Sequence, residues 1–321
     1  MGIQEITLDR LDPAGFIAQK SRELSAAVGE GFAVNALSGG VDSSVVTALG
    51  HKALGSRLKT YFIDNGIMRK DEPAQIAAQF RSIGIPIEIV DAKDRFFAAL
   101  KGLSDPEEKR EAITQTFYKD VFGELVKRSK ARILLQGTIF TDVEETVAGV
   151  KRQHNILSQL GIDTVEQFGY EVVEPLIELR KPGVRKVGEA LGLPLDMYNR
   201  PPFPGPALAA RVIGEVTPAR VALVREATAI VEEELAGSGA FQYLAILHED
   251  RVTGIRDGKR DYGSQIEVRC WESKDAKTAA PTRLDYDILQ KIAARMTSEV
   301  PGVVSVTYNI TSKPTSTIEA V

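Results

Sequence analysis

The chain has 321 residues, 43% of them hydrophobic and 26% charged, which is typical of a globular protein of about two domains. Its net charge of −4 gives no electrostatic footprint for nucleic acid, and its one cysteine, Cys270, excludes an intrachain disulfide framework or a Cys-x-x-Cys site. No apolar run approaches the roughly 18 residues of a membrane span, and no secretion leader opens the chain, so we expect a cytoplasmic protein that binds neither membrane nor nucleic acid.

Short apolar segments alternate with amphipathic ones through the first 200 residues. This alternation predicts an α/β domain over residues 1–200, with a doubly wound parallel sheet covered on both faces. Helices are expected near 13–28, 45–54, 71–83, 94–100, 105–129 and 184–191, and strands near 32–37, 57–63, 86–91, 132–135 and 172–179.

The run Ser38-Gly39-Gly40-Val41-Asp42-Ser43-Ser44 joins the first expected strand to its helix. Glycines let the backbone approach a ligand, and a helix start offers free N–H groups and the positive end of its dipole to an anion. The run lacks the Gly-x-x-x-x-Gly-Lys of the P-loop and the Gly-x-Gly-x-x-Gly of dinucleotide folds. It therefore predicts a different phosphate-binding loop. The residues that would bind the phosphates are Ser38, Gly39, Gly40, Asp42, Ser43 and Ser44.

Two further polar clusters end expected strands: Asp64-Asn65-Gly66 and Gln136-Gly137-Thr138. Ligands of parallel sheets bind at the carboxyl ends of the strands, so one pocket that holds a whole ATP is the simplest interpretation. Asp64 also stands where a dinucleotide fold keeps its ribose carboxylate, but the missing glycine pattern disfavours that fold. Asp64, Gly137 and Thr138 are thus expected to contact ATP.

A charged stretch follows, less regular than the sequence before it. Phe140 to Glu145 brings three carboxylates into six residues, and carboxylate oxygens are ligands that Mg²⁺ takes. Asp142 and Glu145, together with Asp42, are therefore candidate metal ligands, with a solvated charged loop as the alternative. His154 stands beside two cations, and its spacing alone favours a structural role.

Residues 200–206 contain four prolines and one glycine, so they cannot form a helix or a central strand, and they mark a domain boundary. We expect residues 201–321 to form a smaller α+β domain with an antiparallel sheet, one face of which is a dimer surface. Cys270 is expected to be a buried, inert thiol. Helices are expected near 218–235 and 286–300, and strands near 242–247, 252–255, 265–270 and 303–309.

The Ser38–Ser44 loop resembles the signature of the ATP pyrophosphatases, and residues 33–319 resemble the synthetase part of the GMP synthetase family nearly end to end. The most specific matches are the run from Pro202 to Pro206 and the C-terminal run from Ile310 to Glu319. The resemblance implies that ATP, with Mg²⁺, adenylates XMP and that ammonia then displaces AMP to give GMP. From the open face of the second sheet we also expect a homodimer.

The resemblance further implies individual roles. Asp42, Ser43 and Lys313 would be catalytic, and the acceptor nucleotide would contact Arg200, His154, Lys313, Thr317 and Glu319. No glutaminase nucleophile is found, because Cys270 lies in the second domain. We therefore expect a separate glutaminase subunit, or free ammonium, to supply ammonia.

The departures from the family pattern fall on the acceptor side, at residues 140–158, at Pro201 and Ala207, and after Glu319. The ATP side is intact. Two alternatives stay open from the sequence: a divergent paralogue that aminates or thiolates a different carbonyl acceptor, and a non-catalytic ATP-binding protein.

Overall fold

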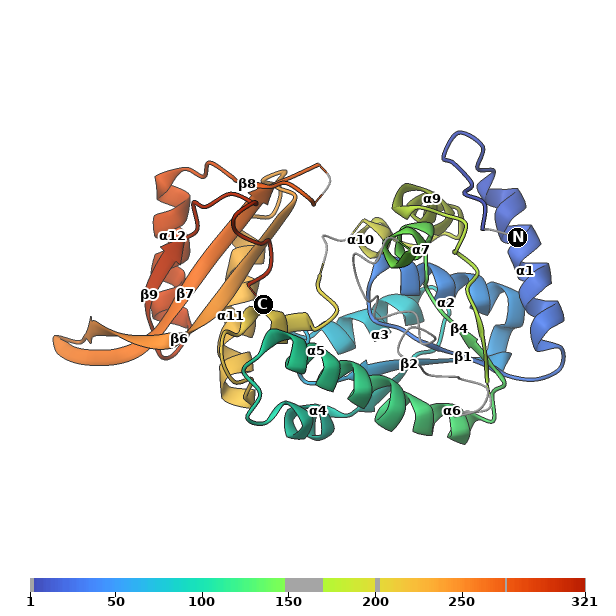
Figure 1. Ribbon diagram of the computed structural model, residues 1–321, viewed down its shortest axis with the longest axis horizontal. Helices are drawn as coiled ribbons and strands as arrows, with labels where there is room; N and C mark the ends of the chain where they lie inside the picture. Colours follow the sequence, from blue (N-terminus) through green and yellow to red (C-terminus); the bar gives the residue numbers. More distant parts are fainter. Residues whose placement is uncertain (1–2, 148–169, 200–202, 275, 321) are drawn as a thin grey trace. The chain divides into compact units, whose positions relative to one another are not determined.

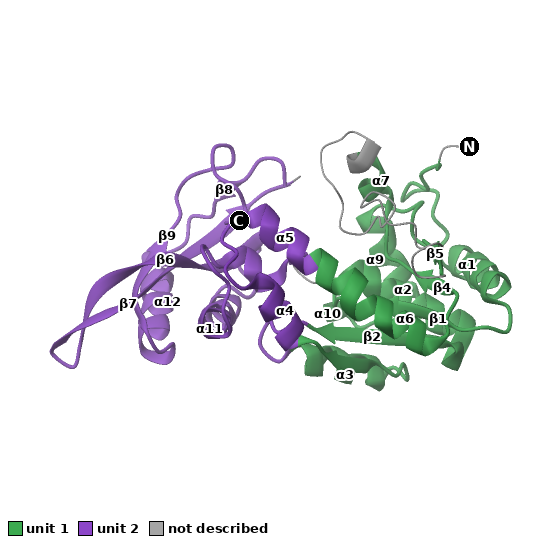
Figure 2. Cartoon of the chain, turned by 60° about the horizontal axis from the view of Figure 1, so that its bottom comes forward, with its two compact units in different colours: residues 1–64, 72–92, 114–200 green, residues 65–71, 93–113, 201–321 purple. Residues whose placement is uncertain are grey.

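The computed structural model describes residues 3–147, 170–199, 203–274 and 276–320 (Figure 1), and of residues 145–147 the backbone only. The chain divides into two compact units, both discontinuous in sequence (Figure 2). The first contains residues 1–64, 72–92 and 114–200, and the second contains residues 65–71, 93–113 and 201–321. The sequence predicts one boundary, after residue 200, and does not separate the two inner segments. The roles assigned to the two domains stay predictions.

The first unit is built on a parallel sheet with the strand order β3-β2-β1-β4-β5. β1 lies at its centre, with Ala33 opposite Leu58 of β2 and opposite Ile133 of β4. The chain moves outward from β1 to one side and then returns to the other side, so the topological switch point lies between β1 and β4. The predicted parallel α/β fold is confirmed. The strands are β1 (Ala33–Ala36), β2 (Leu58–Asp64), β3 (Glu88–Asp91), β4 (Ile133–Leu135) and β5 (Glu171–Val173).

Helices α1, α2 and α9 pack together, and α2 lies directly on the sheet, where Gly50 approaches Leu58 and Leu135. Asp12 caps α1 by accepting a hydrogen bond from the Ala14 amide at 3.1 Å, and Pro13 occupies the first helical position, where proline is favoured. The helices that lie wholly in this unit are α1 (Pro13–Val28), α2 (Val41–Leu54), α3 (Glu72–Ser82), α6 (Gly123–Ser129), α7 (Phe140–Val147), α9 (Lys181–Ala190) and α10 (Leu195–Tyr198), with a short 3₁₀ turn η1 (Gly55–Arg57).

Two helical segments differ from the sequence expectation. The long helix expected over 105–129 contains a π-helical stretch, η2 (Thr116–Phe122), between α5 (Pro106–Gln115) and α6. An amphipathic pattern does not show such a widened turn. Residues 140–147, expected to be irregular, begin as helix α7, and Asp142 in its first turn accepts a hydrogen bond from the Ile139 amide at 2.9 Å. A carboxylate there favours a helix start.

The second unit contains a mixed sheet in which β7 is the central strand and forms a long antiparallel hairpin with β6. The two strands expected at 242–247 and 252–255 are one strand with an irregularity between Leu247 and Arg251. β9 runs parallel to β7, because helix α12 crosses over between them. The strands are β6 (Gln242–Arg256), β7 (Lys259–Glu272), β8 (Ala280–Pro281) and β9 (Val303–Tyr308); the helical segments are α4 (Lys93–Leu100), most of α5, the 3₁₀ turn η4 (Ala207–Arg211), α11 (Pro218–Glu234) and α12 (Tyr286–Glu299).

The two faces of this sheet are covered differently. Helices α11 and α12 pack against β6 and β9, and Cys270 is buried in the sheet, as expected. On the sheet there is also an apolar cluster that the C-terminal tail joins through Ile318, with Leu244, Ile246, Trp271 and Ala279. Part of the sheet is therefore covered by the chain's own tail. None of the helices in the described ranges is long and apolar enough to cross a membrane.

Candidate active site

The Ser38–Ser44 loop is closed by its own serines. Gly39 takes φ +77°, a left-handed conformation that favours glycine. The Ser38 and Ser43 hydroxyl oxygens lie 2.9 Å apart, and the Ser43 hydroxyl donates to the Gly40 carbonyl at 3.0 Å. Helix α2 begins at Val41, earlier than expected, so Asp42 and both following serines lie in its first turn. The amides of a first helical turn have no partners within the helix, so this turn is suited to bind an anion.

Gly137 brings the loop after β4 against this helix start. A Cβ at Gly137 would lie only 3.2 Å from the carbonyl carbon of Asp42 and 3.2 Å from the Ser43 amide nitrogen. The loops after β1 and β4 thus touch at the switch point, where ligands of open α/β sheets bind. Asp64 ends the neighbouring strand β2, half-buried. Thr138, also predicted to contact ATP, has a buried side chain whose hydroxyl donates to the Glu174 carboxylate.

Lys181 joins this site, although the sequence does not predict it as a site residue. Its ammonium lies 2.5 Å from Oδ2 of Asp42, although the two residues are 139 positions apart. Lys181 is the first residue of α9, and its side chain remains 44% exposed, so the ammonium can face a ligand. The other carboxylate oxygen of Asp42 is buried and has no hydrogen-bond partner among the described residues. From the sequence, Lys181 could be found only as a lysine at the start of a helix in the same domain.

Asn35 on β1 fixes the helix behind the loop. Its side-chain amide donates to the Thr47 hydroxyl at 2.6 Å and accepts from the Thr60 hydroxyl at 2.7 Å. Thr47 in turn donates to the backbone carbonyl of Ser43 at 2.7 Å. This buried network ties β1 and β2 to the first turn of α2, so it helps to keep the anion site in place.

Replacing Asn35 with leucine is expected to lower the free energy of unfolding by about 2 kcal/mol, because the buried Thr60 hydroxyl loses its acceptor and the Thr47 hydroxyl loses one of its two partners. Urea unfolding followed by circular dichroism measures this loss. Gln19→Leu, which removes an exposed amide that donates to Glu23 on α1, is the matched control and should change stability little. Equal stabilities of the two variants would contradict the role of the network.

The predicted acceptor residues lie along the C-terminal tail of the second unit. Glu319 forms an ion pair with Arg211 at 3.3 Å and accepts a hydrogen bond from Gln242 at 2.7 Å. The Thr317 hydroxyl donates to the Glu319 carbonyl. Lys313 lies apart from these groups, since its ammonium donates to the Ala276 carbonyl at 2.8 Å. The structure thus brings Thr317 and Glu319 together and directs Lys313 elsewhere.

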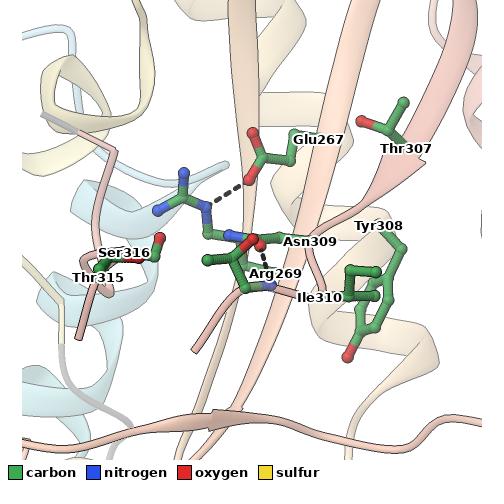
Figure 3. Close-up of a pocket in the computed structure, with 9 residues that line it drawn as sticks. Glu267, Arg269, Thr307, Tyr308, Asn309, Ile310, Thr315 and Ser316 are labelled. Carbon is green, nitrogen blue, oxygen red and sulfur yellow. Dashed lines mark hydrogen bonds and ion pairs between the residues drawn. The ribbon is translucent and has the colours of Figure 1, made fainter. Parts of the chain in front are cut away.

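A pocket of about 530 Å³ opens beside this tail in the second unit (Figure 3). Its wall combines strand residues of β7 and β9 with the loop that leads into the tail. Hydroxyl and amide groups predominate, with one cation, Arg269, held by the carboxylate of Glu267 at 2.6 Å. The lining residues are Glu267, Arg269, Thr307, Tyr308, Asn309, Ile310, Thr311, Thr315 and Ser316.

Comparison with known proteins covers both units. Residues 16–206 match the NAD synthase family model, and residues 230–320 match the model of the GMP synthase C terminal domain. The chain is 46% identical to a subunit of the glutamine-hydrolyzing GMP synthase of Archaeoglobus fulgidus, over 96% of this chain and 99% of that protein. The corresponding subunit of Methanocaldococcus jannaschii is 44% identical with the same coverage. The chain belongs to this family of GMP synthase subunits.

Among solved structures, an NMN synthetase from Francisella tularensis matches with a TM-score of 0.46 and 17% identity, over 61% of this chain and 78% of that one. Membership of the GMP synthase subunit family confirms the family that the sequence predicts from the loop and the tail. The two family models follow in the same order along the chain, the NAD synthase model first and the GMP synthase C terminal domain second.

The structure describes only some of the residues predicted to bind the metal ion or the acceptor nucleotide. Asp142 uses Oδ2 to accept the Ile139 amide, and Asp42 has the unpartnered oxygen noted above. The side chain of Glu145, and His154 and Arg200 altogether, lie outside the described residues. Within the described ranges, no group of three or more His, Cys, Asp or Glu side chains forms a metal cluster.

Proposed function

We propose that this chain is a ligase that aminates XMP to GMP at the expense of ATP, through an adenyl-XMP intermediate. The 2-oxygen of XMP attacks the α-phosphorus, and pyrophosphate leaves. Ammonia then adds to C2 and loses a proton, and AMP leaves with the 2-oxygen. The observation that carries the proposal is the anion site at the switch point of a chain in the GMP synthase subunit family.

On the ATP side, the first turn of α2 and the hydroxyls of Ser38 and Ser43 would hold the β- and γ-phosphates. Ser44 stays a predicted phosphate contact, although its side chain is buried. Lys181 would take up charge on the departing pyrophosphate, and Asp42 orients that lysine by its 2.5 Å contact. We place the adenosine near Asp64 and Gly137, which end or follow the strands on either side of β1.

The carboxylates at this site suit Mg²⁺, because binding of this ion does not require a cluster of three carboxylates. This ion usually binds one or two carboxylates together with substrate phosphates and water. Asp42 has a buried oxygen without a partner among the described residues, and Asp142 is the next candidate, with Glu145. When bound, the ion would neutralise phosphate charge.

On the acceptor side, we place XMP along the tail, in the pocket of Figure 3. Lys313, Thr317 and Glu319 are not in the lining of this pocket, although they are close in sequence to its lining residues Thr315 and Ser316, and they stay predicted contacts, as do Arg200 and His154. Support comes from the match of residues 230–320 to the GMP synthase C terminal domain. The relatives are named as one subunit of a glutamine-hydrolyzing enzyme, which supports a separate glutaminase subunit as the ammonia source. We also propose a homodimer and a cytoplasmic location.

Replacing Lys181 with methionine is expected to slow pyrophosphate release about 10- to 100-fold, because the variant keeps the aliphatic stem but loses the charge beside the leaving group. Release is measured by coupled phosphate detection at saturating ATP and XMP. Lys20→Met is the control: Lys20 on α1 forms ion pairs with Glu23 and Glu178 and should affect the rate little. Equal rates for both variants would remove Lys181 from the site.

The function itself is tested by incubating the purified chain with ATP, Mg²⁺, XMP and ammonium chloride. We expect GMP, AMP and pyrophosphate in equal amounts. Omission of XMP should abolish pyrophosphate release above background. Pyrophosphate without GMP, or ATP binding with no turnover at any ammonium concentration, would contradict the proposal.

A further inference from the structure

Three side chains form a line of ionic hydrogen bonds across the sheet of the second unit. His248 Nε2 on β6 lies 2.8 Å from Oε2 of Glu267, and Nε of Arg269 donates to the other oxygen of Glu267 at 2.6 Å. Both Glu267 and Arg269 lie on β7 two positions apart, so they share one face of the sheet. Figure 3 shows this pair at the pocket wall.

The other end of Arg269 holds the C-terminal tail. Its Nη1 donates to the Thr317 carbonyl at 2.8 Å and lies 3.4 Å from the carbonyl oxygens of both Ile318 and Glu319. In Figure 3 the guanidinium lies between Glu267 and the tail residues Thr315 and Ser316, which line the opposite wall of the pocket. One guanidinium therefore connects the two walls.

The positive charge of Arg269 is neutralised by the adjacent Glu267 carboxylate. The side chains of Arg269 and Glu267 are only 11% and 13% exposed. Burial alone would raise the pKa of Glu267, but the hydrogen bonds from Arg269 and His248 outweigh burial and hold the pKa below its usual range. Glu267 is thus a carboxylate at neutral pH. A charge-assisted contact of this kind is stronger than a neutral one and fixes the plane of the arginine.

We propose that Glu267 is a positioning residue for the acceptor site: it orients Arg269 so that the guanidinium holds residues 317–319 and fixes the tail wall of the pocket. Without the carboxylate, the guanidinium is free to turn toward water in the pocket, and the tail carbonyls lose a common donor. The inference rests on the proposed function in one respect only, namely that the acceptor binds in this pocket.

The proposal predicts a separation between the two substrates. Glu267→Gln keeps the size of the side chain but removes its charge, and we expect it to raise KM for XMP about tenfold. KM for ATP and kcat should stay within twofold. Arg269→Lys, which keeps the charge without the planar fork, should give a smaller rise than Arg269→Met. Asp261→Asn is the matched control, since Asp261 forms an ion pair with Arg256 on the same hairpin, outside the pocket lining.

Amide hydrogen exchange of residues 315–320 is the second measurement, and it needs no substrate. Exchange there should become at least about fivefold faster in Glu267→Gln and stay unchanged in Asp261→Asn, while α11 exchanges as in the wild type. Unchanged tail exchange would overturn the positioning role even if KM changes. Faster tail exchange in an enzyme that makes no GMP would uphold the positioning role and refute the proposed function instead. Equal rises of both KM values would show a general loss of stability and overturn the proposal.

Discussion

Replacing Asp42 with asparagine is expected to lower the rate of pyrophosphate release at least about 100-fold. Asparagine keeps the shape of the side chain, so the fold and the loop should persist. The negative charge that holds the Lys181 ammonium at 2.5 Å is lost, and so is a carboxylate oxygen available to Mg²⁺. The measurement is the rate of pyrophosphate formation at saturating ATP, XMP and ammonium.

The same substitution at Asp12 is the matched control. Asp12 caps α1 in the same unit, and asparagine caps helices about as well as aspartate, so Asp12→Asn should retain full activity. Combining Asp42→Asn with Lys181→Met should cost little more than Asp42→Asn alone, because residues that act as a unit are not additive. An Asp42→Asn rate within threefold of the wild type would refute the assignment of the site.

Replacing Arg211 with methionine is expected to destabilise the second unit by about 3 kcal/mol, the typical cost of breaking a buried ion pair. Arg211 is 1% exposed, and its partner Glu319 is 18% exposed. The guanidinium also lies 4.8 Å from the ring centre of Phe203, in the proline-rich run. Methionine fills similar space but leaves the Glu319 carboxylate with only the Gln242 side chain as a donor among the described residues.

The double variant Arg211→Met/Glu319→Leu separates charge from packing. It should be more stable than the single variant, because an apolar pair leaves no uncompensated charge. Guanidinium unfolding monitored by Trp271, which is buried on the sheet that the tail packs against, reports on this unit. A single variant that is as stable as the wild type, or less destabilised than the double, would contradict the importance of the pair.

Local features were accessible from the sequence because each is encoded within a few neighbouring residues. The Ser38–Ser44 loop is an example: its glycines permit the φ of +77° seen at Gly39, and the alternation around it is enough to predict a parallel sheet. Elements with a less regular sequence were harder to predict. The periodicity of residues 105–129 does not show that one stretch is π-helical. Residues 140–147 form a helix, although their many charged residues suggested an irregular segment.

The sequence by itself thus determined the parallel sheet and the family of the chain, and it predicted a phosphate-binding loop at one strand end, since short motifs with special backbone needs are local. Only the tertiary structure decided which distant side chains complete the sites. Lys181 reaches Asp42 across 139 positions, and Arg269 reaches the Thr317 carbonyl across 48. Such pairs depend on how helices and strands pack, which the periodicity of either segment does not encode. For the same reason, the inclusion of residues 65–71 and 93–113 in the second unit is visible only in three dimensions.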